Sequence, residues 1–306
     1  MTARKAAHAG SWYSDNAAEL GSKLDSYIAQ TDTEQHSLPG ARIIISPHAG
    51  YSYSGPTAAF GFKALDLTGI QRIFILGPSH HMIMRECALP QATIYETPLG
   101  PLQIDTDAIA RLRATGRFEN LANCYDEREH SIEMQLPFLK HIMGDKDIPI
   151  VPILVGGLSF DVECEYGDIL KNDVANPANA FVISSDFCHW GQRFRYKYFH
   201  APPNEPVKSV RSEKNLPIKI WESIELMDRE GIRCIESQSH EAFADYLDET
   251  GNTICGRHPI SVMLAAMERA GLPGAWQLLD YRQSNQVISG TDGSVSYVSE
   301  VFVLET

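Results

Sequence analysis

Three apolar runs in this chain each pass directly into a short polar segment that contains histidine. Isoleucine, leucine, valine, alanine and phenylalanine dominate the runs, as they do in strands buried on both faces of a sheet. Chemistry in an open α/β sheet collects beyond the carboxyl ends of its strands. We therefore expect the polar segments to meet at one edge of a sheet. The runs cover residues 41–46, 71–76 and 180–184, and the histidines that follow are His48, His80, His81 and His189.

These histidines raise the question of a metal site. Neutral imidazole is the commonest metal ligand in proteins, and several converging imidazoles suit iron, copper or zinc. His130 and His258 also lie near Gly, Pro, Ser or Asp at expected element ends. A single histidine is more often a structural hydrogen-bonding residue, and the spacing here matches no zinc signature. The residues alone therefore leave a metal site and a set of structural histidines as equal alternatives.

Two other residues carry chemical interest. Cys255 precedes a predicted helix, whose dipole and free N–H groups favour a thiolate, and Arg257 and His258 add positive charge nearby. The alternative for Cys255 is a small buried apolar residue. Asp186 lies close to His189 and could bind a metal, orient an imidazole or cap a turn.

Composition and charge exclude several classes of function. The 306 residues are 43% hydrophobic and carry a net charge of −13, which argues against non-specific binding to nucleic acid or to anionic membranes. No apolar run approaches the roughly 18–20 residues of a membrane span, and residues 1–7 lack the apolar core of a signal peptide. The six scattered cysteines predict free thiols in a reducing compartment. We expect the cytoplasm, with the nucleus as an alternative.

The pattern of elements predicts one α/β domain without a linker. Residues 50–55 are small and polar and predict a loop before a helix that begins at Pro56. Residues 199–217 contain four prolines and many charges and predict a long surface loop. Alternating apolar residues predict a final strand with one apolar face. The main predicted strands are 43–46, 73–76, 148–155, 180–184 and 294–304, and predicted helices include 56–63, 163–170, 218–227 and 240–247.

Six motifs, taken in order, resemble those of the Memo family, whose founding member mediates cell motility downstream of receptor tyrosine kinases. The resemblance covers about residues 8 to 300. The motifs are similar to those of the eukaryotic branch of the family. The motifs are HAGSWY (8–13), PHAGYSYSG (47–55), RIFILGPSHH (72–81), EHSIEMQLP (129–137), SSDFCHWGQRFRY (184–196) and NTICGRHPI (252–260).

The resemblance implies a fold like that of the class III extradiol dioxygenases. That fold is a single three-layer α/β domain, here residues 1–306, with a mainly parallel or mixed central sheet and helices on both faces. The dioxygenases hold iron with two histidines and a carboxylate. The two histidines match His48 and His80, whereas Cys255 replaces the carboxylate. A thiolate is a softer ligand and shifts the preference toward Cu(I), Zn(II) or thiolate-bound iron.

The resemblance also implies further residues in the same cleft. Asp186 and His189 match such residues, and with His130 they are the candidates for catalysis if the protein has an activity. A phosphotyrosine peptide is implied as a ligand near this cleft. The residues that we expect to line the cleft or contact the peptide are Trp12, Tyr51, Tyr53, His81, Arg195 and His258.

The leading hypothesis is a cytoplasmic protein that binds copper or iron, with zinc as a third option, and acts in redox control or metal homeostasis and in cell-motility signalling. One alternative is an adaptor that binds a phosphotyrosine peptide or a signalling protein. The other is a non-haem metal oxidoreductase or dioxygenase acting on an unknown small substrate. The sequence assigns no reaction to the protein.

Overall fold

The most apolar runs form the centre of the sheet. Strands β2 (Ala41–Ser46), β9 (Asn179–Ser184), β3 (Arg72–Pro78) and β8 (Ile150–Val155) lie side by side in this order, and all three pairings are parallel. Almost every residue in these strands is buried, which explains why the runs lack an alternation of polar and apolar residues. Because the strands are parallel, their carboxyl ends emerge at one edge of the sheet.

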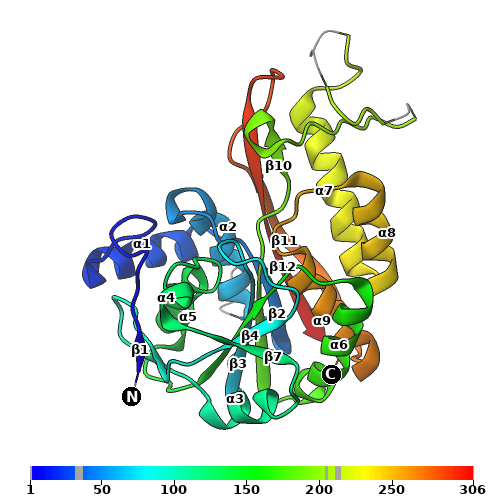
Figure 1. The fold of residues 1–306 in the computed structure, drawn as a ribbon. Coiled ribbons are helices and arrows are strands. Elements are labelled where there is room, and N and C mark those ends of the chain that lie inside the picture. The colour runs from blue at the N-terminus through cyan, green and yellow to red at the C-terminus, as the bar shows by residue number, and fades with distance from the viewer. Residues whose placement is uncertain (1, 32–36, 204–205, 211–214, 306) are drawn as a thin grey trace.

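The computed structural model describes residues 2–31, 37–203, 206–210 and 215–305. Within them, the central sheet has the strand order β10-β12-β2-β9-β3-β8-β4-β7, and β11 also pairs with β12 (Figure 1). Antiparallel pairs flank the parallel centre, so the sheet is mixed. The outer strands are β10 (His189–Gly191), β12 (Gly293–Leu304), β11 (Gly274–Gln283), β4 (Cys87–Pro90) and β7 (Phe118–Leu121). A smaller sheet joins β1 (Ala3–Arg4), β5 (Ile94–Tyr95) and β6 (Leu102–Gln103).

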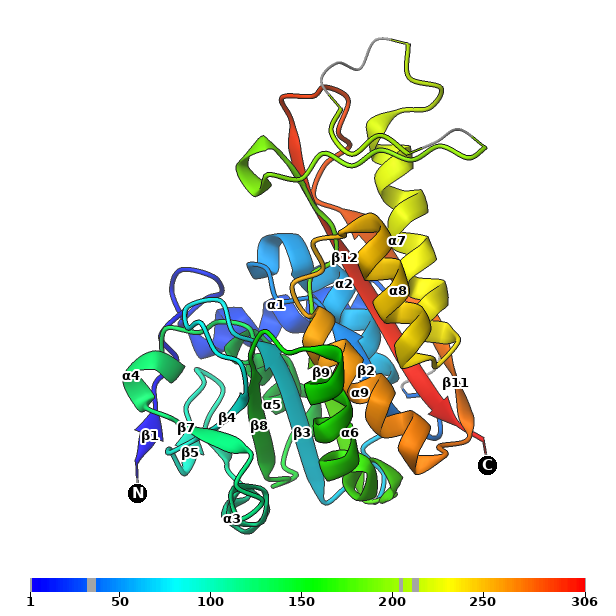
Figure 2. The same cartoon turned by 45° about the vertical axis from the view of Figure 1, so that its right-hand side comes forward.

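Helices cover both faces of the central sheet, as Figures 1 and 2 show from two directions. One face carries α1 (Ala17–Ala29), α2 (Tyr51–Ala64) and α5 (Leu136–Met143). The other carries α6 (Phe160–Ala175) and α9 (Arg257–Ala270), with α7 (Ile220–Glu236) beside β11 and α8 (His240–Thr250) against α7 and α9. This arrangement confirms the predicted three-layer α/β fold with a mixed sheet. Four short helices remain: α3 (Thr106–Arg113), α4 (Asn123–Asp126), η1 (Glu133–Gln135) and η2 (Gln192–Phe194).

The three strands that lead to histidines are neighbours, as predicted. Their order is not the order of the chain, because β9 is inserted between β2 and β3. Thus β2 and β3 are parallel members of one sheet but do not pair directly. The consequence is that the segment after β9 enters the site between the segments that follow the other two strands.

The predicted loop at residues 50–55 is wrong, because α2 already begins at Tyr51. Gly50 is the N-cap, and the N–H groups of Tyr53 and Ser54 donate to its carbonyl oxygen. A Cβ at Gly55 would lie 2.5 Å from the ring of Tyr27, so the glycine allows α1 and α2 to pack closely. Small residues here serve helix packing, and sequence composition alone cannot distinguish that role from a loop.

Two further predictions need correction. The final strand, β12, is buried over most of its length, including its polar residues, where β2 and β11 flank it and α2 packs against it. The predicted helix at 163–170 is longer and runs from Phe160 to Ala175. Gly167 meets the backbone of α9 at Ala265, so the longer helix packs tightly along its neighbour. α5 begins at Leu136, with Pro137 in its first turn, and the Ser131 hydroxyl donates to the carbonyl oxygen of Pro78.

The predicted surface loop at 199–217 is described only in part, since residues 204–205 and 211–214 lie outside the described residues. The described part contains isolated bridges, in which Phe199 pairs with Val207 and Lys197 pairs with Ser209. This segment extends beyond the end of α7 in Figure 2.

Truncation of a core aromatic residue should reveal how much the central strands contribute to stability. Phe181 in β9 is fully buried and stacks on Phe74 of β3, with ring centroids 4.8 Å apart. We expect Phe181→Ala to lower the free energy of unfolding by about 3–5 kcal/mol, whereas Ile288→Ala, at a 66% exposed position, should change it by less than about 0.5 kcal/mol. Urea denaturation followed by fluorescence measures both, and equal effects would contradict the assignment of β9 to the core.

Candidate metal centre

The site is built on three equivalent positions of the parallel sheet. β2 ends at Ser46, β9 at Ser184 and β3 at Pro78, and the second residue after each is His48, Asp186 or His80. Ser46 and Ser184 are partners in the β2–β9 ladder, so the segments leave the sheet at the same level. The sheet register therefore delivers two imidazoles and a carboxylate to one place.

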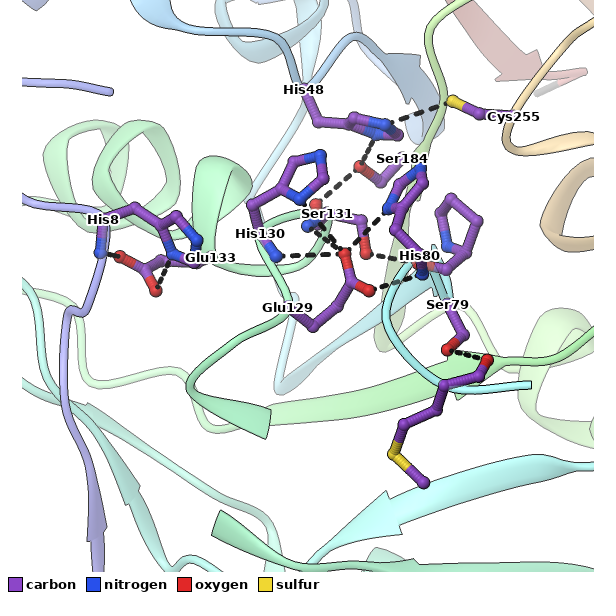
Figure 3. Close-up of polar contacts among 12 residues, drawn as sticks. His8, His48, Ser79, His80, Glu129, His130, Ser131, Glu133, Ser184 and Cys255 are labelled. Atoms are coloured by element: carbon purple, nitrogen blue, oxygen red, sulfur yellow. Dashed lines mark hydrogen bonds and ion pairs between the residues drawn. The ribbon is translucent and has the colours of Figure 1, made fainter. Parts of the chain in front are cut away.

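Three imidazoles converge beyond this edge (Figure 3). One nitrogen from each of His48, His80 and His130 lies within 4.8 Å of the corresponding nitrogens of the other two. His130 stacks on His80, with ring centroids 4.5 Å apart, and comes from the segment before η1. Cys255 approaches from the opposite side, and its Sγ lies 3.1 Å from Nε2 of His48. We call His48, His80, His130 and Cys255 the candidate metal centre.

Hydrogen bonds define the tautomer of His48. The Ser184 hydroxyl donates its single hydrogen to the carbonyl oxygen of Ser131 at 2.6 Å and accepts from the amide of Gln135 at 2.8 Å. Nδ1 of His48 lies 2.8 Å from the same hydroxyl oxygen, which therefore acts as an acceptor. The hydrogen resides on Nδ1, and Nε2 presents its lone pair toward Cys255. Burial lowers the pKa of His48 well below its usual value, which keeps the ring neutral.

Glu129 orients His80 in the same way. One carboxylate oxygen accepts from Nδ1 of His80 at 2.8 Å, and the other accepts from the backbone N–H of His80 at 2.6 Å. The backbone N–H groups of His130 and Ser131 also donate to this carboxylate. Burial alone would raise the pKa of Glu129, but these bonds and the nearby imidazoles lower it to about 2. An ionised Glu129 requires a hydrogen on Nδ1 of His80 and leaves Nε2 as the free donor atom.

His189 follows the same rule at the rim of the site. Its Nδ1 lies 2.9 Å from the carbonyl oxygen of Phe187 and 3.1 Å from that of Thr253. Carbonyl oxygens only accept, so Nδ1 carries the hydrogen and Nε2 is free.

Asp186 positions the backbone of His48 and the segment that contains Cys255. Its Oδ1 accepts from the backbone N–H of His48 at 2.8 Å, and its own main chain bonds to both the N–H and the sulfur of Cys255. Burial raises the pKa of this carboxyl. Gly256 is required next to these hydrogen bonds, because a Cβ at this position would lie 2.4 Å from Ser185. Asp186 thus holds His48 and Cys255 together.

The expected stabilisation of a Cys255 thiolate by its neighbours is wrong for the metal-free protein. Burial raises the pKa of the Cys255 thiol well above its usual value, and the charge of Asp186 acts in the same direction. The guanidinium of Arg257 donates to the carbonyl oxygen of Ile254, and the ring of His258 bonds to Glu163. Both side chains thus have partners other than the sulfur, although Cys255 does precede α9 as predicted.

A buried carboxylate, Glu133, anchors one wall of the site. Glu133 is fully buried and accepts hydrogen bonds from Arg4, from Tyr13 and from both Nδ1 and the N–H of His8. These contacts fix the segment that carries Trp12, whose ring lies 4.4 Å from that of His130 between centroids. The spacing of Glu129 and Glu133, one helical turn apart, was the only signal for this role in the sequence.

The predicted aromatic residues of the cleft divide into two groups. Tyr51 is buried, packs against Tyr13, and donates its hydroxyl to the carbonyl oxygen of Met134. With Trp12 it borders a cavity of about 530 Å³. Tyr53 is 62% exposed and lines a cavity of about 480 Å³ with Arg193 and Tyr297. The sequence did not single out Arg193, whose guanidinium stacks on Phe194.

Three other predicted residues have different positions. His81 is exposed, and its ring lies 6.2 Å from that of His130 between centroids, at the rim of the site. Arg195 is exposed at the end of η2 with a φ of 57°, and the cavity beside it is lined by Arg193 instead. His258 points away from the candidate metal centre, and its Nδ1 lies 2.6 Å from Glu163.

The chemistry of the donor set fits a bound metal ion. His48 and His80 each use Nδ1 for a protein partner and keep Nε2 for a ligand, which is how metal-binding histidines are oriented. The lowered pKa values of His48 and His130, the latter to about 3 because of burial, keep these imidazoles neutral as coordination requires. Two nitrogens and a sulfur, or three nitrogens, are donor sets that suit copper, zinc or iron.

The fold and the site together define an α/β protein with a candidate metal centre of histidines and a cysteine at the carboxyl edge of its sheet. Residues 4–301 match the model of the family described as Memo-like protein. The chain belongs to the Memo family. It is 44% identical over 306 residues to Protein MEMO1 of Xenopus laevis and 42% identical over 304 residues to Protein MEMO1 of Homo sapiens, covering 98% of this chain and 97% of each relative.

Protein memo-1 homolog of Caenorhabditis elegans is 43% identical over 97% of this chain and 82% of its own length. A solved structure of an uncharacterized Escherichia coli K12 protein aligns with a TM-score of 0.47 and 13% identity, covering 85% of this chain and 99% of the other. Within the described residues, no helix combines the length and apolar character that a membrane crossing needs.

The buried Glu133 should make stability depend on pH. Burial opposes ionisation of Glu133, but its bond to His8 and the charge of Arg4 lower its pKa from 4.5 to about 2. Stability from a lowered carboxyl pKa is present above about 4.5 and is lost as the pH falls toward 2. We expect Glu133→Gln to lower the free energy of unfolding by about 3 kcal/mol at pH 7, with a smaller difference at pH 3.5.

Urea denaturation at pH 7, 5 and 3.5 measures this dependence. Glu127→Gln is the control, because this nearby carboxylate bonds to the backbone N–H of Lys5 at an exposed position. A loss in Glu133→Gln that stays constant over this pH range would contradict an ionised, stabilising Glu133.

Proposed function

We propose that this protein binds copper or iron between His48, His80 and Cys255 and acts in redox control or metal homeostasis. The observation that carries the proposal is the set of hydrogen bonds that leaves Nε2 of His48 and His80 free beside a cysteine sulfur. His130 lies close enough to replace the sulfur as a third donor. Membership of the Memo family supports a further role in cell-motility signalling.

The donor atoms favour a soft or borderline metal. A cysteine sulfur selects Cu(I), Zn(II) or iron over hard cations such as Mg²⁺, and imidazole nitrogens suit the same metals. Binding would release the thiol proton of Cys255, which burial holds on the sulfur in the metal-free protein. A bound metal would supply Lewis acidity or electron transfer. The protein residues would orient the imidazoles through Glu129 and Ser184 and hold the sulfur in place through Asp186.

Replacement of one cysteine should distinguish this site from ordinary thiol binding. We expect Cys255→Ser to weaken Cu(I) affinity far more than Cys188→Ser, by about tenfold or more, because only Cys255 lies against His48. Cys188 is fully buried and is the matched control for loss of a sulfur. Competition titration against a Cu(I) chelator gives both affinities. Equal losses would contradict a Cys255 ligand, and a large loss only in His130→Ala would indicate a three-histidine site instead.

A second candidate function is recognition of a phosphotyrosine peptide, and the cavity beside His189 favours it. The cavity is lined by Tyr53, Arg193 and Tyr297. β10 carries His189 opposite Val295 of β12, which also lines the cavity, so the pocket adjoins the strand that carries His189. A guanidinium at such a position suits a phosphate group, and tyrosines suit an aromatic ring.

Two arginines near this cavity allow a controlled test. We expect Arg193→Ala to weaken binding of a phosphotyrosine peptide about tenfold, because one charge-assisted hydrogen bond contributes about 1.5–3 kcal/mol. Arg195→Ala should have little effect, since the cavity lining includes Arg193 instead. Fluorescence anisotropy with phosphorylated and unphosphorylated forms of one peptide measures this. Equal affinity for the two forms would exclude phosphate recognition and leave the metal site as the proposal.

A further inference from the structure

A second cluster of reactive side chains lies outside the candidate metal centre, between α6 and the start of α8. Glu163 and Cys164 on α6 meet His240, the first residue of α8. Nε2 of His240 lies 2.8 Å from Oε2 of Glu163, and Nδ1 lies 3.7 Å from Sγ of Cys164. We propose that Cys164 is a base-activated thiol, oxidised by hydrogen peroxide to a sulfenic acid, with His240 as the base and Glu163 as the residue that positions it.

The carboxylate determines which nitrogen of His240 is basic. Glu163 is almost completely buried, and its two oxygens face Nε2 of His240 and Nδ1 of His258. Burial alone would raise the pKa of Glu163, but the two imidazole bonds lower it, so the group is ionised. An ionised carboxylate only accepts, and Nε2 of His240 must therefore carry the hydrogen. The lone pair of the neutral ring lies on Nδ1, which faces the sulfur.

The ring of His240 is held in this orientation from several directions. Phe160 stacks on it, with ring centroids 4.2 Å apart and planes inclined by 6°. The backbone N–H of His240 donates to the carboxylate of Glu268 on α9 at 2.7 Å. Arg269, also on α9, bonds to Asp168, which lies one helical turn after Cys164 on α6. A positive charge beside the sulfur favours the thiolate.

The other cysteines lack this combination. Outside the candidate metal centre, Cys164 is the cysteine whose sulfur meets an imidazole in the described part of the chain, and it retains some exposed surface. Cys87 and Cys188 are buried, whereas Cys124 is exposed on α4 and Cys234 is partly exposed. A thiol near both a general base and a cation, with access to solvent, is the arrangement that activates a cysteine nucleophile.

The proposed step balances without a group from the metal centre. The S–H proton of Cys164 passes to Nδ1 of His240, and the sulfur attacks one oxygen of hydrogen peroxide. The S–O bond forms as the O–O bond breaks, and the departing oxygen takes up the proton from His240 to leave as water. Sulfur is oxidised by two electrons and the peroxide is reduced, so the products are a sulfenic acid and water.

The experiment compares thiols within one folded protein. Native protein is treated with limiting iodoacetamide at neutral pH, or with a brief pulse of hydrogen peroxide followed by a 1,3-diketone that traps sulfenic acid, and each cysteine is quantified by mass spectrometry. We expect Cys164 to be alkylated about tenfold faster than exposed Cys124 and to carry most of the trapped sulfenic acid. A Cys164 rate equal to or below that of Cys124 would overturn the proposal without any variant.

Variants then test the roles of the neighbours. In His240→Gln and in Glu163→Gln, the rate of Cys164 relative to Cys124 should fall to about one, whereas His141→Gln, at a distant histidine bound to Asp25, should leave it unchanged. Continued protection of Cys87 and Cys188 shows that each variant is folded. An unchanged ratio in a folded His240→Gln protein would overturn the role of His240. Zinc-loaded protein should give the same Cys164 rate, because zinc would act at Cys255.

Discussion

The parallel pairing of β2, β9 and β3 is the constraint on which the site depends. Because these strands pair in register, the segments after Ser46, Ser184 and Pro78 leave the sheet together. A shift of one residue in either ladder would turn every side chain of the shifted strand to the opposite face and separate the segments that follow. The apolar character of the strands on both faces serves the core, and the same burial makes their ends a rigid support for polar groups.

A set of hydrogen bonds then fixes the tautomers and orientations of the imidazoles in the site. Ser184 and Glu129 accept from Nδ1 of His48 and His80, and each acceptor is itself held by neighbouring groups, including Gln135 and backbone N–H groups. These bonds are short, buried and made between elements that are distant in the sequence. The free nitrogens consequently point inward as a property of the folded protein, before any ligand is present. Glu163 orients His240 in the same way between α6 and α8.

The sequence predicted the sheet centre and the three converging segments because strand runs and the residues after them are local features. It could not predict the insertion of β9 between β2 and β3, which depends on long-range pairing. The small residues at 50–55 predicted a loop, whereas Gly55 lies in α2 and allows that helix to pack against Tyr27 of α1. The sequence does not reveal the contacts of Glu129 and Cys164, because their partners are 49 and 76 residues away in the chain. Nothing in the spacing distinguished Arg193 from Arg195.

The position of β12 has a consequence for how the chain is made. This strand, residues Gly293–Leu304, lies between β2 and β11, so it covers an edge of a strand that precedes it by about 250 residues. During synthesis, the N–H and C=O groups of β2 on that side stay unpaired until residues 293–304 have emerged. An apolar strand with an open edge is prone to pair with other chains. The nascent protein therefore passes through a stage in which aggregation competes with folding, and binding by a chaperone would be most useful at that stage.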